Sequence, residues 1–209
     1  MKKILFVVYV SLVTSASFSQ STLTSENKKI FRTENKKKPL LSVNFMLNDF
    51  RTADRIKSSS VSSVFAHKGW SKISEMSPGL SINYMQGLTD HIDFMASLGG
   101  SFADFNFKNV ENASTPSSNR FLLEADANAV FKLLTDKYIV NPYLSAGVGA
   151  SLYNASYGAY IPFGFGIQFK LSEESFLFTN AQYRLGITDK SSNHFNYSIG
   201  FAAPLFGDK

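Results

Sequence analysis

The sequence predicts an all-β fold, an eight-stranded antiparallel up-and-down transmembrane β-barrel. Three observations lead to this prediction. Apolar and polar residues alternate from residue 40 onward, the polar positions of this alternation carry few charges, and short connections alternate with longer ones. A period of two is typical of strands. Short turns that alternate with long loops are typical of outer-membrane barrels, as is an even number of strands.

The first residues predict a secretory signal peptide over 1–19. A basic Met-Lys-Lys start precedes an apolar run over 4–13, and Ser17 and Ser19 are the small residues that a cleavage site requires. An apolar run of this length is too short to cross a bilayer as a helix. We therefore expect export, with a mature chain that starts near Gln20.

Residues 20–39 predict a disordered periplasmic arm that ends at Pro39, because they are polar, charged and without a period. The arm carries six basic and two acidic side chains, whereas residues 40–209 carry thirteen basic and fourteen acidic ones. The net charge of +5 therefore lies in the leader and the arm, and no nucleic acid is expected as a partner. The absence of cysteine excludes disulfides, thiolate metal sites and cysteine nucleophiles.

Eight segments with alternating faces predict the strands of a barrel over 40–209. Most are long enough for a tilted strand that crosses a membrane. In chain order, the apolar faces are Leu41, Val43, Phe45 and Leu47; Leu80, Ile82 and Tyr84; Ile92, Phe94, Ala96 and Leu98; Phe121, Leu123, Ala125, Ala127, Ala129 and Phe131; Val140, Leu144, Ala146 and Val148; Ile161, Phe163, Phe165, Ile167 and Phe169; Leu177, Ala181, Tyr183, Leu185 and Ile187; and Phe195, Tyr197, Ile199, Phe201 and Ala203.

The opposite faces of these strands decide between a membrane barrel and a soluble barrel with an apolar interior. A surface in contact with water carries roughly 25–35% charged residues, but these faces are mostly Gly, Ala, Ser and Asn. The charged residues within the strands are Asp93, Glu124, Asp126, Lys132, Lys170 and Arg184. We therefore expect the apolar faces to contact lipid and the polar faces to fill a narrow lumen.

The connections divide between the two rims of the predicted barrel. Short turns are expected at 86–90, 135–137 and 172–175. The connections of the other rim, which include the long polar ones, are expected at 49–77, 104–119, 154–158 and 188–194. In outer-membrane barrels the short turns and the termini lie on the periplasmic side.

Several segments carry a resemblance to a known family. They are Pro142-Tyr-Leu-Ser-Ala-Gly-Val-Gly-Ala150, Tyr157-Gly-Ala-Tyr-Ile-Pro-Phe-Gly164, Ala181-Gln-Tyr-Arg184, Gly87-Leu-Thr-Asp-His-Ile-Asp-Phe94 and His194-Phe-Asn-Tyr-Ser-Ile-Gly200. Over about residues 40–206 the chain resembles the membrane-barrel part of OmpA-type outer-membrane proteins of Bacteroidota. The resemblance implies the outer membrane of a Gram-negative bacterium. Family members often append a periplasmic peptidoglycan-binding domain, which we expect to be absent because the chain ends at Lys209.

The polar faces predict a hydrogen-bonded network in the lumen. Its expected members are Asp93, Glu124, Asp126, Asn128, Gln182 and Arg184. Arg184 lies nine positions from the turn at Ser175, and Asp126 lies nine from the turn at Thr135, so the two should reach similar depths on opposite walls. Glu124 and Asp126 would alternatively form an acid–base pair, but buried charges are normally paired, and we expect an ion pair with Arg184.

No catalytic residue, cofactor or metal site is expected. The chain lacks a Gly-x-Ser-x-Gly elbow. The three histidines, His67, His91 and His194, lack the spacing of metal ligands, and we expect them to form hydrogen bonds in loops and at rims.

The first long loop predicts a possible contact surface. Its basic and aromatic members are Arg51, Arg55, Lys57, Lys68, Trp70 and Lys72. These residues suit an anionic surface sugar or another extracellular ligand. The alternative is a short amphipathic helix around 60–73 whose apolar residues cap the barrel mouth, since Val61, Val64 and Phe65 have helical spacing.

Two classes of function follow from this reading. One is a small closed outer-membrane barrel with a structural or surface-loop interaction role, with membrane lipid as its partner. The other is a narrow porin-like barrel for small solutes. Eight strands enclose an interior only wide enough for side chains, which favours the first class. We expect a monomer.

Overall fold

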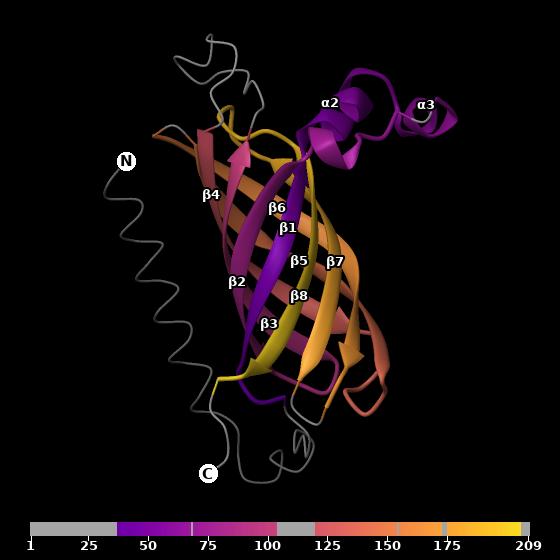
Figure 1. The fold of residues 1–209 in the computed structure, drawn as a ribbon, viewed down its shortest axis with the longest axis vertical. Coiled ribbons are helices and arrows are strands. Elements are labelled where there is room, and N and C mark those ends of the chain that lie inside the picture. Colours follow the sequence, from indigo (N-terminus) through magenta and orange to yellow (C-terminus); the bar gives the residue numbers. More distant parts are fainter. Residues whose placement is uncertain (1–36, 68, 104–119, 154, 173–174, 206–209) are drawn as a thin grey trace, which may run out of the picture. The chain divides into compact units, whose positions relative to one another are not determined.

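The computed structural model describes residues 37–67, 69–103, 120–153, 155–172 and 175–205. The predicted signal peptide over 1–19 lies outside these residues. The described residues form a closed barrel in which each strand pairs antiparallel with the next and the last pairs with the first (Figure 1). The predicted fold, an eight-stranded antiparallel up-and-down barrel, is confirmed.

The strands are ten to fifteen residues long and follow one another in chain order. They are β1 Leu40–Asp49, β2 Ser77–Gly87, β3 Ile92–Ala103, β4 Arg120–Lys132, β5 Val140–Tyr153, β6 Ser156–Lys170, β7 Phe176–Gly186 and β8 His194–Pro204. Helices α2 Phe50–Ser58 and α3 Val61–Ala66 and the 3₁₀ helix η2 Ile73–Glu75 lie between β1 and β2. No helix in this described part of the chain is long and apolar enough to cross a membrane.

The two faces of the wall have the predicted orientation. On β6, Phe163 and Phe165 are exposed on the outer surface, whereas Gly166 and Gln168 are buried inside. Successive residues of a strand point to opposite sides, so each strand contributes one face to the outer surface and the other face to the interior. The outer surface of the barrel is therefore apolar, and the interior holds the buried polar and charged side chains together with some apolar ones.

The connection between β5 and β6 differs from the prediction. A longer connection was expected at 154–158, but the strand pairing continues through Leu152 with Tyr157 and Tyr153 with Ser156. Only residues 154 and 155 lie between the two strands. Ala155 has a φ of 60°, the left-handed conformation that such a tight turn requires. Ser156 and Tyr157 were expected in the loop, but they extend the hairpin.

The first long connection also differs from the prediction of one helix around 60–73 that caps the mouth. The helix α2 was not predicted, and α3 covers only part of the predicted range. The helix α2 buries Phe50, Thr52 and Ala53, and α3 buries Val64. The ring centroid of Phe50 lies 4.4 Å from that of His194 at the mouth. Val61 and Phe65 are exposed, so they do not cap the barrel.

The barrel begins three residues earlier than expected. The Gly87 N–H donates to the Lys37 carbonyl at 3.2 Å, and the Leu205 N–H donates to the Pro39 carbonyl at 2.9 Å. These hydrogen bonds join residues 37–39 to the strands on either side of β1. The last three residues of the arm predicted over 20–39 therefore belong to the barrel, and residues 20–36 lie outside the described residues.

Candidate functional site

Side chains fill the barrel from one end to the other. Two groups of buried apolar residues lie toward the two rims. The group at the short-turn end contains Leu40, Met85, Met95, Val130, Tyr143, Phe176, Phe178 and Ala202. The group at the long-loop end contains Phe50, Ala103, Leu122 and Tyr153. The charged and polar side chains of the lumen form two further clusters, which are the candidate site.

The first of these, the arginine cluster, consists of Glu124 and Asp126 of β4, Arg184 of β7 and His194 of β8. Arg184 donates from Nη1 to Glu124 Oε2 at 2.6 Å and from Nη2 to Asp126 Oδ2 at 3.1 Å. His194 Nε2 lies 3.1 Å from Glu124 Oε1. All four side chains are almost fully buried. The cluster therefore links β4 and β7 across the lumen through two ion pairs, and His194 of β8 lies against the same carboxylate.

Neutral side chains complete the arginine cluster. The Tyr160 hydroxyl donates to Asp126 Oδ2 at 3.1 Å, and the Asn48 amide donates to Glu124 Oε2 at 3.2 Å. The Arg184 guanidinium also lies 5.2 Å from the centre of the Tyr160 ring, within cation–π distance. Buried charges are stable only when such partners replace water.

The second cluster, the lysine cluster, consists of Lys37, Asp93, Lys132 and Asp136. Lys37 Nζ lies 2.9 Å from Asp93 and 3.4 Å from Asp136, and Lys132 Nζ lies 2.8 Å and 2.6 Å from the same two carboxylates. Gln168 accepts from Lys37 Nζ at 2.8 Å and donates to Asp136 at 3.2 Å. Two ammonium groups and two carboxylates thus balance one another at the short-turn end.

Asp136 lies in the turn between β4 and β5, at the edge of the lysine cluster. Burial opposes its ionisation, but the ammonium groups of Lys37 and Lys132 outweigh this effect and hold the pKa of Asp136 below its usual range. Asp136 therefore stays charged at neutral pH. The charge keeps both lysines paired.

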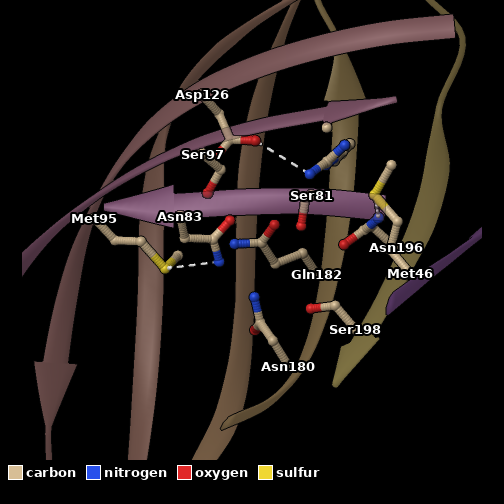
Figure 2. Close-up of a pocket in the computed structure, with 12 residues that line it drawn as sticks. Met46, Ser81, Asn83, Met95, Ser97, Asp126, Asn180, Gln182, Asn196 and Ser198 are labelled. Atoms are coloured by element: carbon tan, nitrogen blue, oxygen red, sulfur yellow. Dashed lines mark hydrogen bonds and ion pairs between the residues drawn. The ribbon is translucent and has the colours of Figure 1, made fainter. Parts of the chain in front are cut away.

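A small polar cavity lies beside the arginine cluster (Figure 2). Its volume is about 10 Å³, which is room for about one water molecule. Serine and amide side chains dominate its lining, and Figure 2 shows Asn83, Asn180 and Gln182 pointing toward one another within it. The lining residues are Met46, Ser81, Asn83, Met95, Ser97, Gly99, Asp126, Asn180, Gln182, Arg184, Asn196 and Ser198. This cavity is too small to serve as a path for solutes.

The structure brings most of the predicted lumen residues together. Arg184 contacts Glu124 and Asp126 as the depth count predicts, and Asn128 donates to Asp126. Gln182 donates instead to Ser145 Oγ at 3.3 Å and lines the cavity. Asp93 was expected in the same network, but it belongs to the lysine cluster. Its position at the short-turn end of β3 separates it from Arg184.

Several members of the two clusters were not predicted. His194 lies at the rim, as expected, but its contact with Glu124 was not predicted. The sequence already placed it on the same strand face as Asn196 and Ser198. Lys132 was predicted on the polar face of its strand, but no partner was predicted for it. Lys37 and Asp136 lie outside the alternating segments, so no periodic signal marked them.

The predicted loop surface lies at the long-loop rim. Arg51, Arg55 and Lys57 lie on α2, and Trp70 and Lys72 lie between α3 and η2. Lys68 lies outside the described residues. Arg51 and Arg55 come within 3.8 Å and 3.9 Å of Glu75, and all of these basic side chains have exposed surface.

Comparisons with known proteins identify the fold. No family model matches the sequence, and no curated protein matches it. The N-terminal β-barrel domain of Pseudomonas aeruginosa OprF is similar, with a TM-score of 0.50, 12% identity, and coverage of 81% of this chain and 98% of that one. Neisserial surface protein A gives a TM-score of 0.53 and 16% identity, with coverage of 82% and 99%. The outer membrane protein OprG from Pseudomonas aeruginosa gives a TM-score of 0.52 and 10% identity, with coverage of 81% of this chain and 96% of that one. The chain thus has the fold of small eight-stranded outer-membrane barrels.

Proposed function

We propose that this protein is a small closed barrel of the outer membrane of a Gram-negative bacterium, with a structural role and a surface displayed by its long loops, and without catalysis. The observation that carries the proposal is the inverted distribution of polarity. The strand charges of both clusters are buried inside, and large apolar side chains are exposed outside. Only a lipid environment makes this arrangement favourable.

The outer surface of the wall supports contact with lipid. Leu80, Val148 and Phe165 are 64%, 68% and 64% exposed on three different strands. Single exposed apolar residues are normal in soluble proteins, but a continuous apolar wall around the barrel is not. Closure of the barrel also leaves no strand edge free for pairing, which supports a monomer.

The filled interior supports a closed barrel over a porin-like one. Both ionic clusters cross the lumen, and the polar cavity beside the arginine cluster holds about one water molecule. A solute would have to separate several buried ion pairs to pass.

The resemblance to OmpA-type proteins of Bacteroidota supports the orientation in the membrane and export by the signal peptide over 1–19. Short turns would face the periplasm, and the connection that contains α2 and α3 would face the outside. Membrane lipid is then the main partner. The exposed connections are the part of the barrel that can meet an extracellular ligand or surface polysaccharide.

Single-cysteine labelling tests this proposal, because the natural chain contains no cysteine. Ser62 of α3 and Lys137 of the β4–β5 turn are both exposed and lie in connections of opposite rims. We expect a membrane-impermeant maleimide to label S62C on intact cells, and to label K137C only after the outer membrane is opened. Recovery of the protein in the soluble fraction, or equal labelling of both variants on intact cells, would contradict the proposal.

A further inference from the structure

Exposed apolar side chains distinguish the connection between β1 and β2, namely Val61, Phe65, Trp70 and Ile73. Phe65, Trp70 and Ile73 are 64%, 40% and 74% exposed. The Phe65 and Trp70 rings pack edge to face with centroids 5.3 Å apart. Phe65 lies on α3 and Trp70 lies between α3 and η2, so the pair lies outside the strands. Figure 1 shows α2 and α3 beyond the end of β1.

These side chains continue the aromatic outer wall of the barrel. The centroid of Trp70 lies 6.0 Å from that of Phe195 on β8, and Phe195 lies 4.9 Å from Tyr183 on β7. Phe195 and Tyr183 lie on the outward faces of their strands, near the long-loop rim. Barrels of this kind carry rings of aromatic residues where the wall meets the headgroup region. Trp70 therefore extends such a ring from the wall onto the connection.

Hydrogen bonds hold the connection in this position. Asp49 at the end of β1 accepts from the Thr52 N–H at 2.9 Å and from the Ser71 hydroxyl at 2.7 Å. The Ser71 N–H donates to Thr52 Oγ1 at 2.9 Å, and Arg55 donates to the Gly69 carbonyl at 2.8 Å. The residues on both sides of Trp70 are thus tied to α2, so Trp70 does not depend on a ligand for its orientation.

Positive charge accompanies the apolar side chains. Residues 50–75 contain five basic and two acidic side chains, a net charge of +3, whereas residues 40–209 are nearly neutral. Arg51 and Arg55 share the single carboxylate of Glu75 at long distances, and Lys72 is exposed. Apolar and aromatic residues beside basic ones are typical of segments that lie in a membrane interface and attract anionic lipid.

We propose that the helix α2 and residues 61–67 and 69–75 form an interfacial anchor. Phe65, Trp70 and Ile73 insert into the outer leaflet, and Arg51, Arg55 and Lys72 bind the phosphate of an anionic lipid. The inference rests on the proposed function, since the wall must itself lie in a membrane. It narrows the partner of the predicted loop surface to a lipid headgroup. If the surface instead binds a soluble partner, these side chains lie in water as long as that partner is not bound.

Trp70 reports on the anchor directly, because it is the only tryptophan of the chain. The mature protein is folded into phosphatidylcholine vesicles with and without phosphatidylglycerol, and the tryptophan emission is measured. We expect quenching by lipids brominated close to the headgroup and protection from aqueous iodide. We also expect a further blue shift when phosphatidylglycerol is present.

Matched variants separate the two halves of the proposal. I73S should increase the iodide quenching of Trp70, whereas I139S, at a residue with a similar exposure of 71% on the opposite rim, should not. R51Q combined with K72Q should abolish the shift caused by phosphatidylglycerol, whereas K137Q should preserve it.

Two results would overturn the anchor, and they differ from each other. If the barrel floats with the vesicles and shows heat-modifiable migration, but iodide quenches Trp70 fully and brominated lipid does not, the anchor is wrong and the proposed function stands. That result is the one expected of a surface that binds a soluble partner. If the protein does not float with vesicles of either composition, both the anchor and the proposed function are wrong.

Discussion

Each of the five charged strand residues in the lumen has a partner of opposite charge. Asp93 and Lys132 pair in the lysine cluster, and Glu124, Asp126 and Arg184 pair in the arginine cluster. An unpaired charge in this setting would cost several kcal/mol. The pairs therefore help to fix which face of β3, β4 and β7 lies inside.

Arg184→Ala should destabilise the barrel by about 3–5 kcal/mol, because it leaves two buried carboxylates without their guanidinium partner. The measurement is the free energy of unfolding in urea, read from the loss of heat-modifiable migration. Glu124→Gln combined with Asp126→Asn should act through the same contacts. Independent, additive effects of the two changes in a double-mutant cycle would show that these pairs do not stabilise the barrel.

Phe165→Arg should prevent or strongly impair assembly, because an arginine near the middle of the lipid-facing wall costs about 2–4 kcal/mol. The control on the same strand is Gln168→Met, which keeps a long, uncharged side chain inside the lumen, where Gln168 accepts from Lys37 and donates to Asp136. We expect this change to lower the yield of folded protein less than Phe165→Arg does. Folding yields into vesicles compare the two variants, and equal yields would mean that the faces are assigned wrongly.

The helix α2 depends on one residue at the end of β1. Asp49 caps the first turn of α2 and also accepts from Ser71, so one carboxylate joins the strand, the helix and the segment next to Trp70. Phe50 follows directly and covers His194. Asp49 thus fixes where the connection between β1 and β2 lies relative to the mouth of the barrel.

Asp49→Ala should release the connection, since loss of an N-cap costs about 1 kcal/mol and Ser71 loses its acceptor as well. We expect faster proteolysis between β1 and β2 while the barrel stays folded. Asp49→Asn keeps a side-chain acceptor for the cap and should behave nearly as the natural protein does. Equal cleavage of all three proteins would contradict this role.

Lys37, in the segment that precedes β1, contributes a charge to the lumen. The stability that its contact with Asp136 provides depends on pH. The pKa of Asp136 is lowered in the folded barrel, so its ionic contacts stabilise the protein above about pH 4 and are lost as the pH falls through the lowered value. Lys37→Met removes one of its two ammonium partners. As the pH is lowered from about 5 to about 2, the variant should therefore lose less stability than the natural protein does. A steeper loss in the variant, measured by thermal unfolding at each pH, would contradict this account.

The strands were predictable because lipid and lumen impose a strict period of two on the sequence. The contact of Arg184 with Asp126 was predictable for a related reason, since regular strands allow depth to be counted from the turns. The helix α2 was not, because it has only nine residues, most of them polar, and its buried apolar residues are Phe50 and Ala53 alone. Lys37 was missed because a single side chain that enters the lumen from outside a strand leaves no pattern.

The described residues form a barrel whose outer wall is apolar and whose interior holds buried side chains at both ends and between them. Apolar groups lie toward both rims, and two ionic clusters cross the lumen. The proposed role therefore assigns function to the surfaces of the barrel, which are the wall and the connections at the long-loop rim.

The single-channel conductance of the purified mature protein in a planar lipid bilayer tests this claim most directly. We expect no steady conductance from the natural protein, and openings only when both clusters are weakened by Arg184→Ala together with Lys37→Met. Insertion is verified beforehand by flotation with vesicles, so that silence reports a closed lumen. Stable ohmic steps from the natural protein would show that the lumen is open and that the porin-like alternative is correct.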